Sequence, residues 1–143
     1  MPRRIRNILV DSGFWFALYD GRDQYHQQAL EKSRLLDSVT VLLPWPCLYE
    51  TINTRFCKQR KAVAEFEAFL SRPGVVLLED EPYRENALEA VFVNGRTGRR
   101  PLALVDMVLR LILEDPNVRK HGILTFNPGD FADLCGKHSI ELL

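Results

Sequence analysis

Short hydrophobic runs recur along the chain and are bounded by charged or turn-forming residues. They lie at residues 8–10, 39–44, 75–78, 123–126 and 140–143. Runs of this length that are rich in Val, Ile and Leu are typical of strands buried on both faces of a sheet. The pattern therefore predicts five β-strands.

The segments between these runs carry hydrophobic residues at helical spacing. These segments are Tyr25 to Leu36, Leu48 to Phe56, Val63 to Leu70, Ala87 to Phe92 and Leu102 to Leu113. Strands that alternate with helices predict a mostly parallel sheet with helices on both faces. Pro44, Pro46 and Pro116 support the boundaries, since proline ends strands and starts or stops helices. We expect one α/β domain over residues 1–143, with a central five-stranded sheet flanked by helices.

The amino-acid composition is consistent with one α/β domain and limits the partners that overall charge could attract. A chain of 143 residues with 46% hydrophobic residues has the size and core of one ordinary domain. Basic and acidic residues both number 19, so no overall charge favours a nucleic-acid or membrane partner. Any electrostatic recognition must therefore be local.

Cysteine usage and hydropathy predict a cytoplasmic protein. Cys47, Cys57 and Cys135 are odd in number and lack Cys-x-x-Cys spacing, which argues against a disulfide framework or a structural zinc site. We see no signal peptide before the first strand, and no hydrophobic stretch approaches the ~18 residues of a membrane span. We therefore expect reduced thiols that pack in the core.

Two acidic residues stand in hydrophobic surroundings. Asp11 ends the first hydrophobic run, and Asp106 lies in a segment that is hydrophobic nearly all round. An ionised carboxylate removed from water is costly unless a partner compensates it. We therefore expect a partner for each of these acids.

The predicted topology brings acids together at one edge of the sheet. In open α/β sheets the ligand site lies beyond the carboxyl ends of the strands. Asp11, Glu50 and Asp130 follow three different strands, so they are expected near this edge. Asp106 precedes a strand on its helix, and it reaches the same edge only if the connection before that helix allows it.

Each acid also has a structural interpretation. Asp106 and Arg110 are spaced for an ion pair along a helix, worth ~0.3–0.5 kcal/mol. Glu50 near a helix N-terminus would interact with the helix dipole. Asp130 is a candidate N-cap for the segment that follows it. Taken together these interpretations are weaker, because two of the acids lie in hydrophobic sequence.

A cluster of carboxylates has a definite chemistry. Carboxylates at close range retain protons or bind cations. Hard oxygen ligands select Mg²⁺ or Mn²⁺. Such a site activates water and stabilises a leaving oxygen, which is the chemistry of phosphodiester hydrolysis.

Several motifs resemble the PIN domain, and specifically the small VapC ribonuclease toxins of type II toxin–antitoxin modules. The motifs are "NILVDSGFWFALYD", "DQYHQQA", "YETINTRF", "LALVDMVLRLIL" and "ILTFNPGDF", in the family's order over nearly the whole chain. The resemblance implies a Rossmann-like fold and an endoribonuclease that depends on Mg²⁺ or Mn²⁺. It identifies Asp11, Glu50, Asp106 and Asp130 as the metal-binding and catalytic acids.

The resemblance extends to supporting residues and partners. It implies hydrogen-bonding roles for Ser12, Thr125 and Asn127, an RNA substrate, a cognate antitoxin and a homodimer. The stretch "NGRTGRR" is expected to be a flexible basic loop that contacts RNA phosphates through Arg96, Arg99 and Arg100. Two positions depart from the family pattern: Gly13 replaces a common hydroxyl residue, and Arg110 replaces a common small residue.

Other functions fit the sequence less well. A haloacid-dehalogenase-like phosphatase needs a second Asp where Gly13 stands, and a response-regulator receiver needs an acidic pair at the end of its first strand. A PIN-like module that binds without catalysis is disfavoured by the four acids. A PIN nuclease that processes RNA without an antitoxin remains an alternative, which a small reading frame immediately upstream would disfavour.

Overall fold

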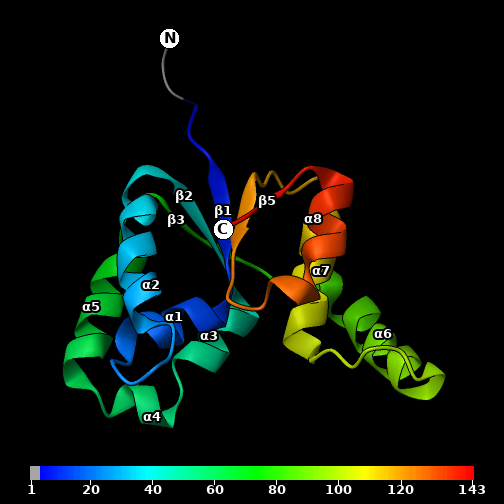
Figure 1. The fold of residues 1–143 in the computed structure, drawn as a ribbon, viewed down its shortest axis with the longest axis horizontal. Coiled ribbons are helices and arrows are strands. Elements are labelled where there is room, and N and C mark those ends of the chain that lie inside the picture. The colour runs from blue at the N-terminus through cyan, green and yellow to red at the C-terminus, as the bar shows by residue number, and fades with distance from the viewer. Residues whose placement is uncertain (1–3) are drawn as a thin grey trace.

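The computed structural model describes residues 4–143 and contains one five-stranded sheet (Figure 1). The strands are β1 (Asn7–Val10), β2 (Thr40–Pro44), β3 (Val75–Leu78), β4 (Gly122–Leu124) and β5 (Glu141–Leu142). Their order is β3-β2-β1-β4-β5, and every neighbouring pair is parallel. The predicted α/β fold is therefore confirmed, with a sheet that is parallel throughout.

Strand residues alternate between two hydrophobic clusters, one on each face of the sheet. Ile8 and Val10 point into the first cluster, while Leu9 between them points into the second. All three side chains are fully buried. This period of two, with both faces covered, explains why the strands appear in the sequence as continuous hydrophobic runs.

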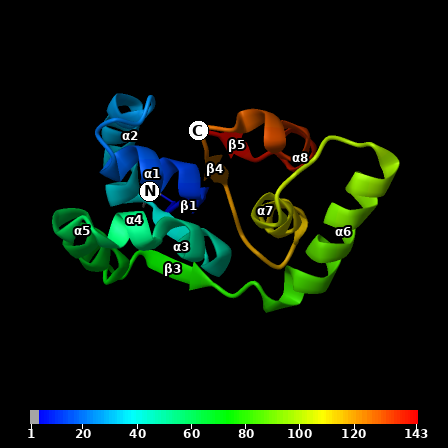
Figure 2. The same ribbon diagram turned by 90° about the horizontal axis from the view of Figure 1, so that it is seen from below.

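Helices cover the two faces in two groups (Figures 1 and 2). The first group comprises α1 (Ser12–Tyr19), α2 (His26–Lys32), the 3-10 helix η1 (Ser33–Ser38), α4 (Thr54–Cys57) and α5 (Arg60–Leu70). The second comprises α6 (Arg84–Thr97), α7 (Leu104–Glu114) and α8 (Ala132–His138). The short helix α3 (Trp45–Thr51) follows β2, and the 3-10 helices η2 (Glu81–Tyr83) and η3 (Pro128–Asp130) lie in connections.

The predicted helix from Leu48 to Phe56 is two helices in the structure. α3 ends before Ile52, and the Asn53 side chain accepts a hydrogen bond of 2.9 Å from the Phe56 backbone N–H to cap α4. A side-chain cap of this kind starts a new helix with a new direction. The hydrophobic spacing across the break therefore predicted one helix where there are two.

The predicted basic loop at Asn94 to Arg100 is largely helical. α6 continues to Thr97 and ends at Gly98, which adopts the left-handed conformation with φ of 68°. Glycine takes this conformation without steric strain and commonly ends helices. The expectation of a flexible loop was wrong for Arg96, which lies in the last turn of α6, and the connection to α7 is only Gly98 to Ala103.

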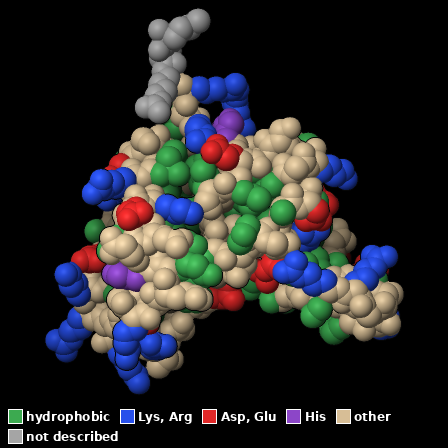
Figure 3. Space-filling model, viewed as in Figure 1, with side chains coloured by type: hydrophobic (Ala, Val, Ile, Leu, Met, Phe, Trp, Pro, Cys, Tyr) green, Lys and Arg blue, Asp and Glu red, His purple; other side chains and the backbone are tan. Residues whose placement is uncertain are grey.

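Surface charges of both signs are interspersed over the face shown in Figure 3, as expected for a chain with zero formal charge. The three cysteines form no disulfide: Cys47 and Cys135 are buried, and Cys57 is exposed. Among residues 4–143, no helix has the length and hydrophobicity needed to cross a membrane.

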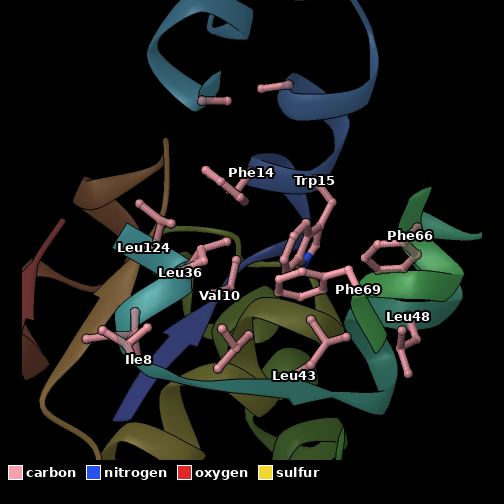
Figure 4. Packing of buried hydrophobic residues seen from close by; sticks show 14 of the residues in the cluster. Ile8, Val10, Phe14, Trp15, Leu36, Leu43, Leu48, Phe66, Phe69 and Leu124 are labelled. Carbon is pink, nitrogen blue, oxygen red and sulfur yellow. The ribbon is translucent and has the colours of Figure 1, made fainter. Parts of the chain in front are cut away.

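Aromatic packing fixes α1 against α5 (Figure 4). The Trp15 ring lies 5.2 Å from the Phe66 ring and 5.1 Å from the Phe69 ring, centroid to centroid. Trp15 is fully buried, and such contacts add about 0.5–1.5 kcal/mol per pair to the burial itself. Because α1 begins directly after Asp11, this packing also fixes the backbone next to Asp11.

Candidate metal centre

Asp11 lies at the carboxyl end of β1, in the turn between β1 and α1. Its backbone N–H donates to the Leu124 carbonyl at 3.0 Å, which extends the pairing of β1 with β4. The residue has extended backbone angles and precedes the first residue of α1, and only 3% of it is exposed. The sheet therefore places a buried carboxylate at its carboxyl edge, as the sequence predicted.

The partners of Asp11 are hydroxyl groups. Thr125 donates to one carboxylate oxygen at 2.9 Å, and Ser12 lies 3.4 Å from the other. The Thr125 hydroxyl accepts a hydrogen bond of 3.0 Å from the Asn127 backbone N–H, so Asn127 contributes through its main chain. No ion pair to Asp11 is formed within residues 4–143. Burial raises the pKa of Asp11, against the lowering effect of these hydroxyls, and the Glu50 charge raises it further.

Ser12 connects Asp11 to Glu50. Its hydroxyl donates to a Glu50 carboxylate oxygen at 2.7 Å. Glu50 is the sixth of the seven residues of α3, close to the end of that helix. A carboxylate there gains nothing from the dipole of the helix N-terminus, so the structural interpretation of Glu50 was wrong.

Asp106 lies in the first turn of α7. Burial raises its pKa to about 6, and the charges of Asp11, Asp130 and Glu50 each raise it further. The connection Gly98 to Ala103 brings the start of α7 to the carboxyl edge of the sheet, which settles the geometry that the sequence left open. Asp106 therefore lies close enough to the other three predicted acids for their charges to act on it.

The expected pair between Asp106 and Arg110 is not formed. Arg110 instead makes two hydrogen bonds of 2.8 Å to the Asp133 carboxylate, and a third of 2.7 Å to the Asp130 carbonyl. This bidentate contact holds the pKa of Asp133 down at about 2. Arg110 thus connects α7 to the segment at η3 and α8, and it does not neutralise Asp106.

Asp130 is the last residue of η3, and its carboxylate pairs with Arg100. The same guanidinium donates to the Gly129 carbonyl at 2.9 Å. α8 begins at Ala132 and is preceded by Phe131, so Asp130 is not its N-cap and that interpretation was wrong. The pairing of Asp130 with Arg100 was not foreseen from the sequence.

Cys47 lies near three of the acids. The residue is fully buried on α3, and burial raises the pKa of its thiol well above the ordinary value. The neighbouring charges of Asp11, Glu50 and Asp106 raise it further. Cys47 is therefore a buried neutral thiol.

The other predicted RNA contacts lie on one side of this site. A cavity of about 380 Å³ beside Asp130 is lined by Arg99, Arg100 and Arg110. Arg96 is one turn away, at the end of α6, where it borders a separate hydrophobic cavity with Phe92 and Leu102. Two of the three predicted arginines therefore share a cavity next to the acids.

The chemical type of the donor atoms at this site suits a hard divalent cation. Asp11 is buried, Asp106 is partly buried and Glu50 is exposed, and charge and the Ser12 hydroxyl link the three. Carboxylate and hydroxyl oxygens are the ligands that Mg²⁺ and Mn²⁺ prefer. As the side chains stand, no three Asp, Glu, His or Cys residues in the described part of the chain have the spacing that holds a metal ion. Side-chain rotation is therefore needed before these carboxylates converge on one ion.

Comparisons with known proteins establish the fold. No protein-family model matches the chain, and no curated protein matches it. The structure is similar to the crystal structure of VapC20 of Mycobacterium tuberculosis, a sarcin-ricin loop cleaving toxin, with a TM-score of 0.68 and 22% sequence identity. The match covers 88% of this chain and 94% of that one. The chain therefore has the PIN-like α/β fold of that toxin.

Proposed function

We propose that the protein is a VapC-like PIN-domain endoribonuclease that hydrolyses RNA phosphodiester bonds with Mg²⁺ or Mn²⁺. The observation that carries this proposal is the buried Asp11, which directly follows β1. It has no cationic partner among residues 4–143, and Ser12 lies between it and Glu50. A structural acid in that position would be expected to pair with Lys or Arg. An unpaired buried carboxylate beside two further acids supports a cation site.

Asp11, Glu50 and Asp106 would hold the metal ion, with Asp130 as a fourth acid. When bound, the ion would supply an activated water and stabilise charge on the leaving oxygen. The chain's own groups prepare this site, since the Thr125 hydroxyl fixes the Asp11 carboxylate and the Ser12 hydroxyl, which lies beside Asp11, donates a hydrogen bond to Glu50. The raised pKa of Asp106 means that this carboxylate gains most from a nearby cation, because a bound divalent ion favours its ionised form.

RNA would approach along the arginine side of the site. Arg99 and Arg100 line the cavity beside Asp130, and both side chains are accessible to solvent. Guanidinium groups bind phosphate oxygens with paired hydrogen bonds. We therefore propose Arg96, Arg99 and Arg100 as contacts to the RNA backbone, which would orient the strand across the acids without reading its sequence.

A homodimer is the proposed assembly. The outer face of α6 and the start of α7 expose Leu88, Phe92 and Leu104, at 47%, 56% and 45%. A hydrophobic groove of about 470 Å³ runs beside them from Glu50 to Leu88. Exposed hydrophobic residues gathered in this way mark interaction surfaces, and a second copy of the chain is the proposed occupant.

The molecular mass of the protein in solution, measured by light scattering as it elutes from a size-exclusion column, tests the assembly. We expect twice the 16.5 kDa of the chain for the wild type, and the monomer mass for Phe92→Glu. Leu30→Glu on α2, with 42% exposure, is the matched control and should remain a dimer. A monomeric wild type would rule out this assembly.

A cognate antitoxin is the proposed regulator, and the cytoplasm is the proposed site of action. The fold similarity to a VapC toxin supports both. The product of a small reading frame next to this one should bind the chain tightly and block cleavage. If no such frame exists and the enzyme is active, a role in RNA processing without an antitoxin replaces the toxin function.

Cleavage of RNA tests the activity. Total cellular RNA and a sarcin-ricin loop oligonucleotide are incubated with wild type, Asp11→Asn and Asp37→Asn, each with Mg²⁺, Mn²⁺ or chelator. Asp37 is the control, because its side chain is 68% exposed and pairs with Arg72 and with none of the four acids. We expect discrete products from wild type and the control only, and only with metal. A folded wild type that cleaves nothing would favour a non-catalytic binding module.

A further inference from the structure

Arg100 forms an ion pair with Asp130, the fourth acid of the site. It lies in the connection Gly98 to Ala103, whose backbone is fixed by hydrogen bonds to the end of α6. The Arg99 backbone N–H donates to the Asn94 carbonyl at 3.2 Å, and the Asn94 side chain lies 3.5 Å from the Arg100 carbonyl. Gly98 turns the chain between them with its left-handed φ of 68°. The backbone at Arg100 is therefore anchored to the end of α6.

The guanidinium contacts two neighbouring groups of η3. It donates to the Gly129 carbonyl at 2.9 Å and to the Asp130 carboxylate, with which it forms an ion pair. A Cβ atom at residue 129 would lie only 3.4 Å from one of its nitrogens, so the flat group rests directly on the glycine. The planar fork of arginine suits such a double contact, which lysine cannot reproduce.

Asp130 is also fixed from its other side. Arg110 donates to its backbone carbonyl at 2.7 Å while it binds Asp133. The Asp130 side chain is 15% exposed, whereas Arg100 is 64% exposed. The backbone of Asp130 is thus fixed by one arginine, and its carboxylate is engaged by another that solvent can reach.

The remaining three acids have no such partner. Asp11 and Glu50 accept hydrogen bonds from hydroxyl groups, and no ion pair to Asp11, Glu50 or Asp106 is formed in the described part of the chain. A divalent ion that arrives at the site therefore meets three uncompensated carboxylates and one that already has a counter-charge.

We propose that Arg100 is a positioning residue that acts as an internal counter-ion for Asp130, so that Asp11, Glu50 and Asp106 bind the metal and Asp130 does not. This inference rests on the proposed function and narrows its ligand set from four acids to three. Removal of Arg100 frees the Asp130 carboxylate to join the site. Arg100 thereby limits the affinity for metal.

Mn²⁺ binding to the metal-free protein tests this inference without any activity measurement. The free Mn²⁺ is followed by electron paramagnetic resonance during titration of wild type, Arg100→Ala and Arg99→Ala. Arg99→Ala is the matched control, because it removes the same charge from the same connection but not the contact with Asp130. We expect roughly fivefold tighter binding for Arg100→Ala, in the range of an exposed ion pair, and no change beyond about twofold for the control.

Asp130→Asn tests whether that acid is a metal ligand or only the ion-pair partner of Arg100. In the wild-type background we expect it to leave Mn²⁺ affinity within about twofold, and in the Arg100→Ala background to abolish the gain. Arg100→Lys, which retains the charge, should fall between wild type and Arg100→Ala, and it guards against misfolding of the alanine variant.

Two results would overturn the inference alone. They are equal affinities of wild type and Arg100→Ala, and a loss of affinity in Asp130→Asn as large as in Asp11→Asn. A folded wild type that binds no Mn²⁺ would overturn the proposed function together with the inference. The two failures are therefore distinguishable in one set of titrations.

Discussion

Replacement of Asp106 by Asn should stabilise the metal-free protein at neutral pH. The folded chain raises the pKa of Asp106 from its ordinary 3.8 to about 6. Without solvent screening, this rise in pKa corresponds to roughly 3 kcal/mol by which the ionised carboxylate destabilises the folded state. Because the group is about half buried, solvent screening reduces the effect to about 1–2 kcal/mol. The neutral amide avoids this cost.

The effect depends on pH in a defined direction. A carboxylate whose pKa is raised by folding favours the folded state most below its unfolded pKa, and this contribution is lost as pH rises through the folded pKa. The stability of the wild type should therefore fall, relative to Asp106→Asn, between pH 3.8 and about pH 6. Above this window the difference should stay constant.

Thermal unfolding in chelator, from pH 4 to pH 7.5, measures the difference. We expect the Tm of Asp106→Asn to exceed that of the wild type by roughly 2–8 °C at pH 7.5 and to match it near pH 4. Asp37→Asn, which removes an exposed acid paired with Arg72 at 2.9 Å, should show no gain at any pH. A difference that does not vary with pH, or a less stable Asp106→Asn at pH 7.5, would refute the reasoning.

Three further predictions follow from the packing and the hydrogen bonds. Gly13→Ala should stabilise α1 by about 0.5 kcal/mol in urea unfolding, because alanine favours helix and a Cβ there meets no atom within 4 Å; destabilisation would reveal a contact that the structure lacks. Arg110→Ala should cost about 1–2 kcal/mol, because it breaks both hydrogen bonds to Asp133, and an unchanged unfolding midpoint would refute this. Thiol labelling of the native protein should modify Cys57 and spare Cys47, whose pKa is raised by burial, and rapid native labelling at Cys47 would contradict its placement.

The sheet was predictable because its strands are buried on both faces. Ile8 and Val10 enter one cluster and Leu9 enters the other, so the whole run is hydrophobic and stands out in the sequence. Asp11 was predictable for the same reason, as the polar residue that interrupts such a run. The carboxyl ends of parallel strands meet at one edge, which placed Glu50 and Asp130 nearby.

Helix limits were less predictable, because they depend on single capping contacts. The spacing of Leu48, Ile52 and Phe56 suits one helix, yet the Asn53 side chain starts a second one. α1 was not predicted as a helix, since Phe14, Trp15 and Ala17 are all buried and leave no polar face to mark the helical period.

The polar contacts of the site could not be predicted from the sequence and were found only in the structure. Arg100 and Asp130 are 30 residues apart in the sequence, and nothing local to either predicts their ion pair. Arg110 lies four residues after Asp106, as expected for an intrahelical pair, but the Asp133 carboxylate offers it a bidentate contact instead. Sequence spacing identified the charged groups, and the fold selected their partners.

The most direct test of the central claim is the rate of RNA cleavage as a function of Mg²⁺ concentration, for wild type and Asp11→Asn side by side. The account predicts a wild-type rate that rises with Mg²⁺ and saturates, and no metal-dependent cleavage by the folded variant. Equal cleavage by both proteins, or a wild-type rate that does not depend on the metal, would contradict it.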